Sequence, residues 1–114
     1  MTPVNIQALD QNIQENKKIA SLGQAVHRLR ANRDFKEIFI EGYFKHEALR
    51  LVTLLSHPAM QTPEHQKSIL TQMTAISAVD QYLTEVLRQA SLAESNIAAD
   101  EQTREEVLAE GDDA

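Results

Sequence analysis

Hydrophobic residues recur at helical spacing along most of the chain. In the first stretch, residues 3–31, apolar or small side chains follow heptad-like steps, with Asn16 as the polar member: Ile6, Leu9, Ile13, Ala20 and Gly23. About 140–180° around the same helix lies a second stripe: Ile19, Leu22, Val26 and Leu29. A helix packed on one core needs one stripe. We therefore expect the first set to form a partner interface, with Gly23 marking either a local bend or close approach of another helix backbone.

The next apolar segment covers residues 33–56 and changes face in the middle. Asn32 or Asp34 can cap its start. Before Gly42 the apolar face holds Phe35, Ile38 and Phe39, and after it the face moves to Phe44, Ala48, Leu51, Val52 and Leu55. A glycine at such a shift predicts a helix end or a kink. Pro58 ends the segment near Ser56.

A third helix is predicted over residues 63–98. Thr62 and Pro63 supply a cap and a first helical position. Apolar residues then follow steps of three and four: Ile69, Met73, Ile76, Leu83, Leu87, Ala90 and Ile97. The six-residue connection after the second helix favours an antiparallel hairpin, in which Tyr43 and Phe44 are core and core-edge residues.

These patterns predict an all-α fold, an elongated three-helix or helical-hairpin-plus-arm arrangement with a long C-terminal helix. The 114 residues fit one helical domain over residues 1–98, with helices at about 3–31, 33–56 (kinked near Gly42) and 63–98. The net charge of −6 resides in an acidic tail over residues 99–114, because residues 1–98 are neutral. We expect this tail to fray beyond about Asp100; the alternative is an extension of the last helix.

The candidate chemistry is sparse. The chain has no cysteine, and its four histidines, at 27, 46, 57 and 65, lack the spacing of metal ligands. His46-Glu47 begins a zinc-protease motif, but Arg50 occupies the second histidine position. Glycine-rich phosphate loops are absent. We therefore expect no enzymatic activity, no catalytic, cofactor-binding or metal site, and no cofactor. We also expect no signal peptide and no membrane span.

One charged cluster precedes the second helix. It holds six cations against Asp34 alone: Lys17, Lys18, Arg28, Arg30, Arg33 and Lys36. One interpretation is a solvated face; the other is anion contact with nucleic-acid phosphate or with an acidic tail, on the same chain or a neighbour. An isoelectric point near 5.1 argues against a dedicated nucleic-acid binder.

The run from Asp34 to Leu83 resembles small helical proteins of tailed bacteriophages. The resemblance lies in the Asp-Phe-Lys start, the E-G-Y-F segment, the E-A-x-R-L-V run and the apolar helix that ends in Tyr-Leu. It implies a phage gene product, a virion or assembly component located in the host cytoplasm and/or the virion. The resemblance brings no catalytic residues with it.

The function expected from these features is structural: a non-enzymatic helical protein that self-associates or docks on a larger complex. Its expected partners are further copies of itself or other phage structural proteins. The alternative is a phage-encoded binding module that acts on host nucleic acid or a host regulator through the basic cluster at residues 17–36.

Overall fold

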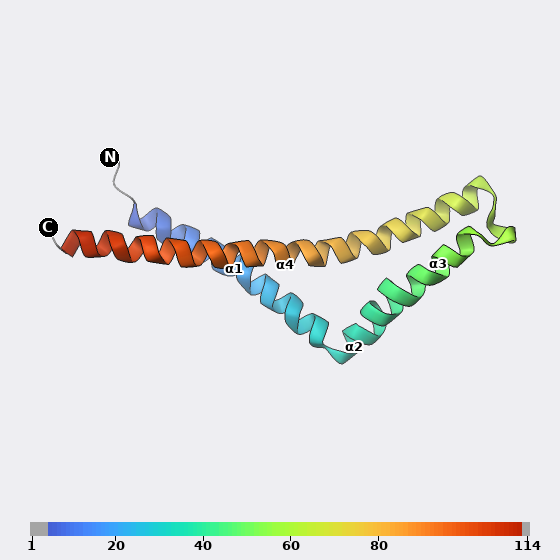
Figure 1. The fold of residues 1–114 in the computed structure, drawn as a ribbon, viewed down its shortest axis with the longest axis horizontal. Helices are drawn as coiled ribbons and strands as arrows, with labels where there is room; N and C mark the ends of the chain where they lie inside the picture. Colours follow the sequence, from blue (N-terminus) through green and yellow to red (C-terminus); the bar gives the residue numbers. More distant parts are fainter. Residues whose placement is uncertain (1–4, 113–114) are drawn as a thin grey trace. The chain divides into compact units, whose positions relative to one another are not determined.

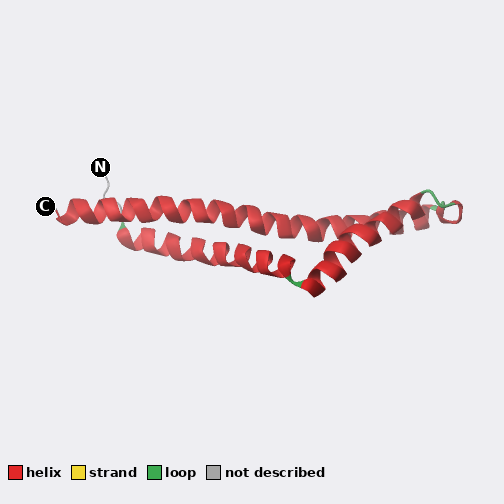
Figure 2. Ribbon diagram, turned by 60° about the horizontal axis from the view of Figure 1, so that its bottom comes forward, coloured by secondary structure: helices red, strands yellow, loops and turns green. Residues whose placement is uncertain are grey.

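The computed structural model describes residues 5–112, which form helices joined by short connections (Figures 1 and 2). No strand occurs among these residues, and the longest helix is the last one, so the predicted all-α class with a long C-terminal helix is confirmed. None of the helices in this range has a stretch long and apolar enough to span a bilayer.

The first helix, α1, runs from Ile6 to Ala31. Asn5 caps it, because its Oδ1 accepts a hydrogen bond from the backbone N–H of Gln7 at 2.9 Å. The predicted cap at Thr2 and Pro3 lies outside the described residues. Asn32 is extended and ends the helix; its Oδ1 accepts from the N–H of Phe35 at 2.9 Å, which makes Asn32 the cap of the next segment.

The middle segment is helical throughout, and the predicted kink near Gly42 is replaced by a π-helix. It consists of α2 (Arg33–Phe35), the π-helix η1 (Lys36–Glu47) and α3 (Ala48–Leu55). A π-helix closes its hydrogen bonds over five residues, which widens each turn and rotates the apolar face without a break. Gly42 suits this geometry, since a methyl group there would lie 3.1 Å from the carbonyl oxygen of Glu37, five residues earlier.

Aromatic contacts accompany the wide turn of η1. Phe35 and Phe39 stack with ring centroids 5.1 Å apart. Phe39 then reaches both Tyr43 and Phe44, at 6.1 and 6.4 Å, four and five residues along. Aromatic pairs at such distances contribute about 0.5–1.5 kcal/mol each beyond burial. The side-chain contacts therefore favour the unusual backbone.

The connection to the last helix is fixed by side-chain caps. His57 accepts the N–H of Ala59 through Nδ1 at 3.1 Å and starts the short 3₁₀ helix η2 (Pro58–Met60). Gln66 donates to the carbonyl oxygens of Leu55 and Met60, at 3.1 and 2.7 Å. Thr62 Oγ1 accepts from the N–H of His65, as the sequence predicts for a capping residue.

The last helix, α4, runs from Pro63 to Asp112 and is continuous in Figure 1. It does not end near Ala98, and the acidic segment extends it instead of fraying near Asp100. Fraying was expected because few residues in this segment are apolar. However, Thr103, Arg104 and Val107 are half-buried, and Arg104 forms an ion pair with α1. These contacts offset the absence of basic residues in the last turn.

The chain divides into two compact units, each described here by itself. Unit 1 comprises residues 5–26 and 86–112 of the described range, and unit 2 comprises His27–Glu85. This division does not follow the predicted single domain over residues 1–98, because the residues after Ala98 belong to unit 1 with the first helix.

Unit 2 is the predicted helical hairpin. Its core is Leu51, which is fully buried, with Ile69 and Ile76 of α4. Packed against them are Tyr43, Phe44, Ala48, Leu54, Leu55, Met60 and Met73. The interpretation of Tyr43 and Phe44 as packing residues is thus confirmed. Val52, placed by periodicity on the same face, is exposed instead.

Unit 1 pairs α1 with the C-terminal half of α4 along a seam of small residues. The buried members are Ile13, Ala20, Gly23, Val26, Val86, Ala90 and Ala93. At Gly23 the backbone approaches α4 so closely that a Cβ atom there would collide with Cβ of Ala90. Of the two readings of Gly23, close approach of a helix holds, and the approaching helix belongs to the same chain.

We predict that Gly23→Ala destabilises the protein, although alanine is normally favoured over glycine in a helix by about 1 kcal/mol. The added methyl group must separate the helices, and overpacking of this kind typically costs about 1–3 kcal/mol. The measurement is urea unfolding followed by circular dichroism.

Two variants control for propensity and for the contact itself. Gly111→Ala should be neutral or stabilising, because nothing lies within 4 Å of that position. Ala90→Gly should rescue most of the loss in the Gly23→Ala background. A Gly23→Ala protein as stable as the Gly111→Ala protein would contradict the close contact.

Candidate functional site

Charged side chains from α1 and from the acidic end of α4 meet on one side of unit 1. Arg104 Nε donates to Asp10 Oδ1 at 2.7 Å, and both side chains are partly exposed. Beside this pair is a hollow of about 320 Å³, whose lining includes Ile13 and Gln14 together with the five charged residues that we call the polar flank: Asp10, Lys17, Glu101, Arg104 and Glu105.

The polar flank supplies an intramolecular partner for one end of the basic cluster. Lys17 lines the same hollow as Glu101 and Glu105, and Asp10 faces Arg104. Opposite charges so placed attract one another, although by little at an exposed site. Lys17 thus lies near carboxylates of the acidic segment of its own chain, while an attraction between the basic cluster and the acidic tail stays a prediction.

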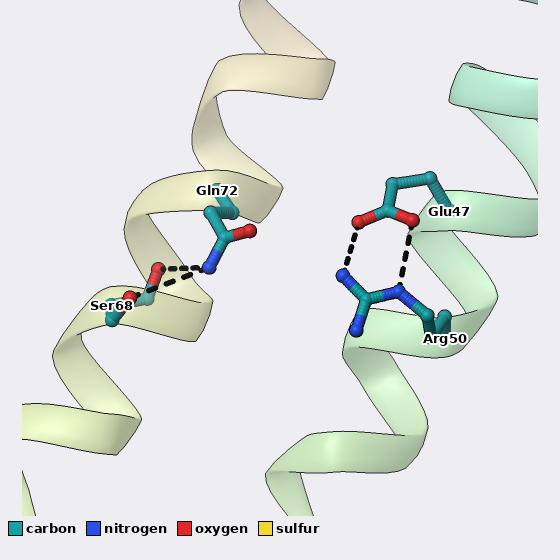
Figure 3. Close-up of polar contacts among 4 residues, drawn as sticks. All are labelled: Glu47, Arg50, Ser68 and Gln72. Carbon is teal, nitrogen blue, oxygen red and sulfur yellow. Dashed lines mark hydrogen bonds and ion pairs between the residues drawn. The ribbon is translucent and has the colours of Figure 1, made fainter.

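A second polar arrangement lies in unit 2, beside the hairpin core. A small hollow of about 130 Å³ is lined by Tyr43, Glu47, Leu51, Gln72, Ala75 and Ile76. Next to this hollow, Arg50 donates two parallel hydrogen bonds to the carboxylate of Glu47 (Figure 3). Nε donates to Oε2 at 2.9 Å and Nη2 to Oε1 at 2.5 Å. On α4, Gln72 Nε2 donates to Oγ and to the carbonyl oxygen of Ser68, each at 3.3 Å.

The Glu47–Arg50 pair has the bidentate geometry that gives strong charge-assisted hydrogen bonds. Hydrogen bonding from Arg50 holds the pKa of the Glu47 carboxyl below its ordinary value, and the positive charge of Arg50 acts in the same direction. The same hydrogen bonding raises the pKa of Arg50. A carboxylate held this way stays ionised and occupied, so it is poorly suited to proton transfer near neutral pH.

Carboxylates lie near several of the six cations of the basic cluster. Arg30 lies 4.0 Å from Asp80, and Arg33 and Lys36 line a hollow that they share with Glu37 and Glu41. Lys18 and Arg28 are exposed on α1. Carboxylates beside four of the six cations, counting Lys17, weaken attraction for phosphate.

The predicted partner interface is largely buried within the chain. Ile13 is only 5% exposed, and Ala20 and Gly23 are also buried in the seam of unit 1. Ile6 and Leu9 are half-buried. The assignment to a partner is therefore wrong for Ile13, Ala20 and Gly23, because the antiparallel half of α4 covers them.

The stripe expected to face the chain's own core is mostly exposed. Of its four members only Val26 is buried, while Ile19, Leu22 and Leu29 are exposed. The two stripes of α1 have thus exchanged the roles that hydrophobicity alone suggested. Size explains the exchange, since the small residues allow the close helix approach at Gly23.

The histidines occupy unrelated places. His57 is a cap, His46 lines a shallow apolar hollow with Leu49 and Leu54, and His27 and His65 are exposed. Among the described residues no group of three histidine or carboxylate side chains has a geometry that could hold a metal ion.

Sequence reasoning missed the Glu47–Arg50 and Asp10–Arg104 ion pairs. The Glu47–Arg50 pair carries a detectable signal, because residues three apart are neighbours on a helix surface. The Asp10–Arg104 pair spans 94 positions. Only the antiparallel register of α1 and α4 reveals it, and that register depends on the contact at Gly23.

Comparisons of the chain with protein family models, curated proteins and solved structures find no match. The resemblance of residues 34–83 to phage proteins thus gains no further support from them. Function must therefore be argued from the surfaces and contacts of the two units.

We predict that Asp10→Asn lowers stability by about 0.2–1 kcal/mol, the range of exposed ion pairs. The amide removes the charge that Arg104 faces while keeping the shape. A charge exchange, Asp10→Arg with Arg104→Asp, should recover most of the loss, and high salt should shrink the difference. Urea unfolding in low and high salt measures both effects. Glu94→Gln, at an exposed position of α4 in the same unit, is the control; equal effects of Asp10→Asn and Glu94→Gln would refute the role of the pair.

We predict that Glu47 titrates below the ordinary value of 4.5 and that Arg50→Gln returns it toward that value. Because the folded-state pKa is depressed, the pair stabilises the fold above the unfolded-state pKa. This contribution disappears as the pH falls through the lowered value. Carboxyl chemical shifts followed by NMR measure the titration. Arg50→Lys should give an intermediate shift, because an ammonium keeps the charge and loses the two-pronged geometry. An unchanged Glu47 titration in Arg50→Gln would disprove this cause.

Proposed function

We propose that the protein is a non-enzymatic helical structural or assembly protein that acts through self-association or by docking on a larger complex. The observation that carries the proposal is an inverted distribution of side-chain size in unit 1. Four of the seven buried seam residues are glycine or alanine, whereas the larger Ile19, Leu22 and Leu92 are more than a third exposed.

Burial energetics explain why this distribution favours association. A buried leucine or isoleucine contributes about 1.5–3 kcal/mol, whereas glycine has no side chain and alanine a single methyl group to contribute. The paired helices of unit 1 therefore leave part of their possible hydrophobic stabilisation unused, at Ile19, Leu22 and Leu92. A second surface that covers these residues recovers that free energy.

The polar groups support a non-enzymatic role. In unit 1, Asp10 and Arg104 neutralise each other, and in unit 2 Arg50 occupies both carboxylate oxygens of Glu47. Both pairs join their partners at hydrogen-bonding distance. Neither presents a free nucleophile or base beside a pocket suited to a substrate.

A more specific proposal follows from the resemblance of residues 34–83 to tailed-phage proteins. On that ground we assign the chain to a virion or to virion assembly, in the host cytoplasm and/or the virion. Other phage structural proteins are then the partners expected besides further copies of the chain.

The test of self-association is the molar mass in solution. Multi-angle light scattering and sedimentation equilibrium, run over a wide concentration range, should give masses above the 12.8 kDa of one chain, rising with concentration. Circular dichroism confirms that the sample is helical. A folded protein that stays at 12.8 kDa throughout would overturn the self-association proposal.

A further inference from the structure

We infer that one flank of unit 1, opposite the polar flank, binds the same flank of a second copy in antiparallel orientation. This inference rests on the proposed self-association and names its surface and geometry. We call this surface the neutral flank, and its described residues are Ile19 and Leu22 of α1 with Leu92, Asn96 and Ala99 of α4.

Helical geometry places these residues together. Lys17 and Glu101 line one hollow, so they mark the same side of the helix pair. Ile19 and Ala99 each lie two residues from them, a rotation of about 200°, and therefore face the other side. Leu22 lies within about 60° of Ile19, and Leu92 is seven residues before Ala99 on the same face.

The neutral flank is exposed, apolar and uncharged at its centre. Leu22 is 52% and Leu92 55% exposed. From Ile19 to Val26, α1 has no ionisable side chain. From Ala90 to Ala99, α4 has only Glu94, which lies about 160° from Leu92 on the opposite side. A second copy can thus meet this surface without stacking like charges, despite the net charge of −6.

Charge selects the antiparallel orientation. Glu15 lies seven residues before Leu22, and Glu106 seven after Ala99, so both carboxylates close the same end of the flank. Parallel copies would bring these four carboxylates together. Antiparallel copies separate them and bring Glu15 toward the last turn of the partner's α1, where Arg30 lies eleven residues after Ile19 and therefore on the same face. Glu15 has no ion pair within the described chain.

The first test uses a double variant that carries both Leu22→Gln and Leu92→Gln. Its control is the single variant Leu108→Gln. Glutamine is a good helix former, and the two leucines are more than half exposed, so the fold should persist. Leu108 is an exposed leucine of the same helix that lies seven residues beyond Glu101, on the side of the polar flank. We expect the double variant to weaken self-association at least about tenfold in dissociation constant, while Leu108→Gln leaves it unchanged.

The second test measures orientation in the unaltered interface. Because the chain has no cysteine, Gln11→Cys accepts a single nitroxide label near one end of α1. The distance between the labels of two copies is measured by double electron–electron resonance. In antiparallel copies centred near Leu22 it should be about 30 Å, because a helix rises 1.5 Å per residue. Parallel copies would place them within about 20 Å.

The outcomes separate the two proposals. A wild-type protein that is monomeric at all concentrations refutes both the self-association and this surface. Self-association that survives in the Leu22/Leu92 variant, or that is lost equally in Leu108→Gln, refutes the neutral flank alone. A short label distance refutes the antiparallel arrangement.

Discussion

The contact between Gly23 and Ala90 sets the geometry of unit 1. It brings the two helix backbones so close that no side chain larger than a hydrogen fits on α1 at that point. The rest of the seam adapts to this approach, with Ala20 and Ala93 buried beside it. The contact also sets the register of α1 against α4. That register brings Asp10 to Arg104 and aligns Lys17 with the acidic end of α4.

The same contact explains which parts of the fold could be predicted from the sequence. Helix spacing, the Asn32 and Thr62 caps and the hairpin of unit 2 follow from local rules, and the structure has them. The choice between the two stripes of α1 does not, because both are apolar and either can satisfy a core. The choice depends on the distance between the two helix backbones at Gly23, and the residue that faces Gly23 there, Ala90, is 67 positions away in the sequence.

Two further differences have the same kind of cause. Gly42 was expected to break or kink a helix, but the aromatic contacts over four and five residues favour a π-helix that retains it. The segment after Ala98 was expected to fray because of its composition, yet Arg104 has a partner in α1. Both the π-helix at Gly42 and the helix after Ala98 depend on side-chain contacts that amino-acid composition does not reveal. The candidate site could likewise be predicted only in part from the sequence. Glu47 and Arg50 are three residues apart on one helix, whereas the polar flank joins residues of α1 and α4 that are far apart in the sequence.

Side-chain size, more than hydrophobicity, thus assigns the faces of α1. The close approach at Gly23 leaves no room there for a large side chain, and Ile19, Leu22 and Leu92 are exposed on the outside of the helix pair. The charged residues face away from these apolar ones, because two positions along a helix correspond to a rotation of about 200°. Lys17 is two residues from Ile19, and Glu101 is two residues from Ala99. Lys17 and Glu101 line the same hollow on one flank, and the uncharged stretches of α1 and α4 lie on the other flank. Such a helix pair has one flank that carries the Asp10–Arg104 ion pair and one flank with exposed apolar residues. In the self-association proposed above, a second copy covers this apolar flank, and the removal of its leucine and isoleucine side chains from water favours the complex.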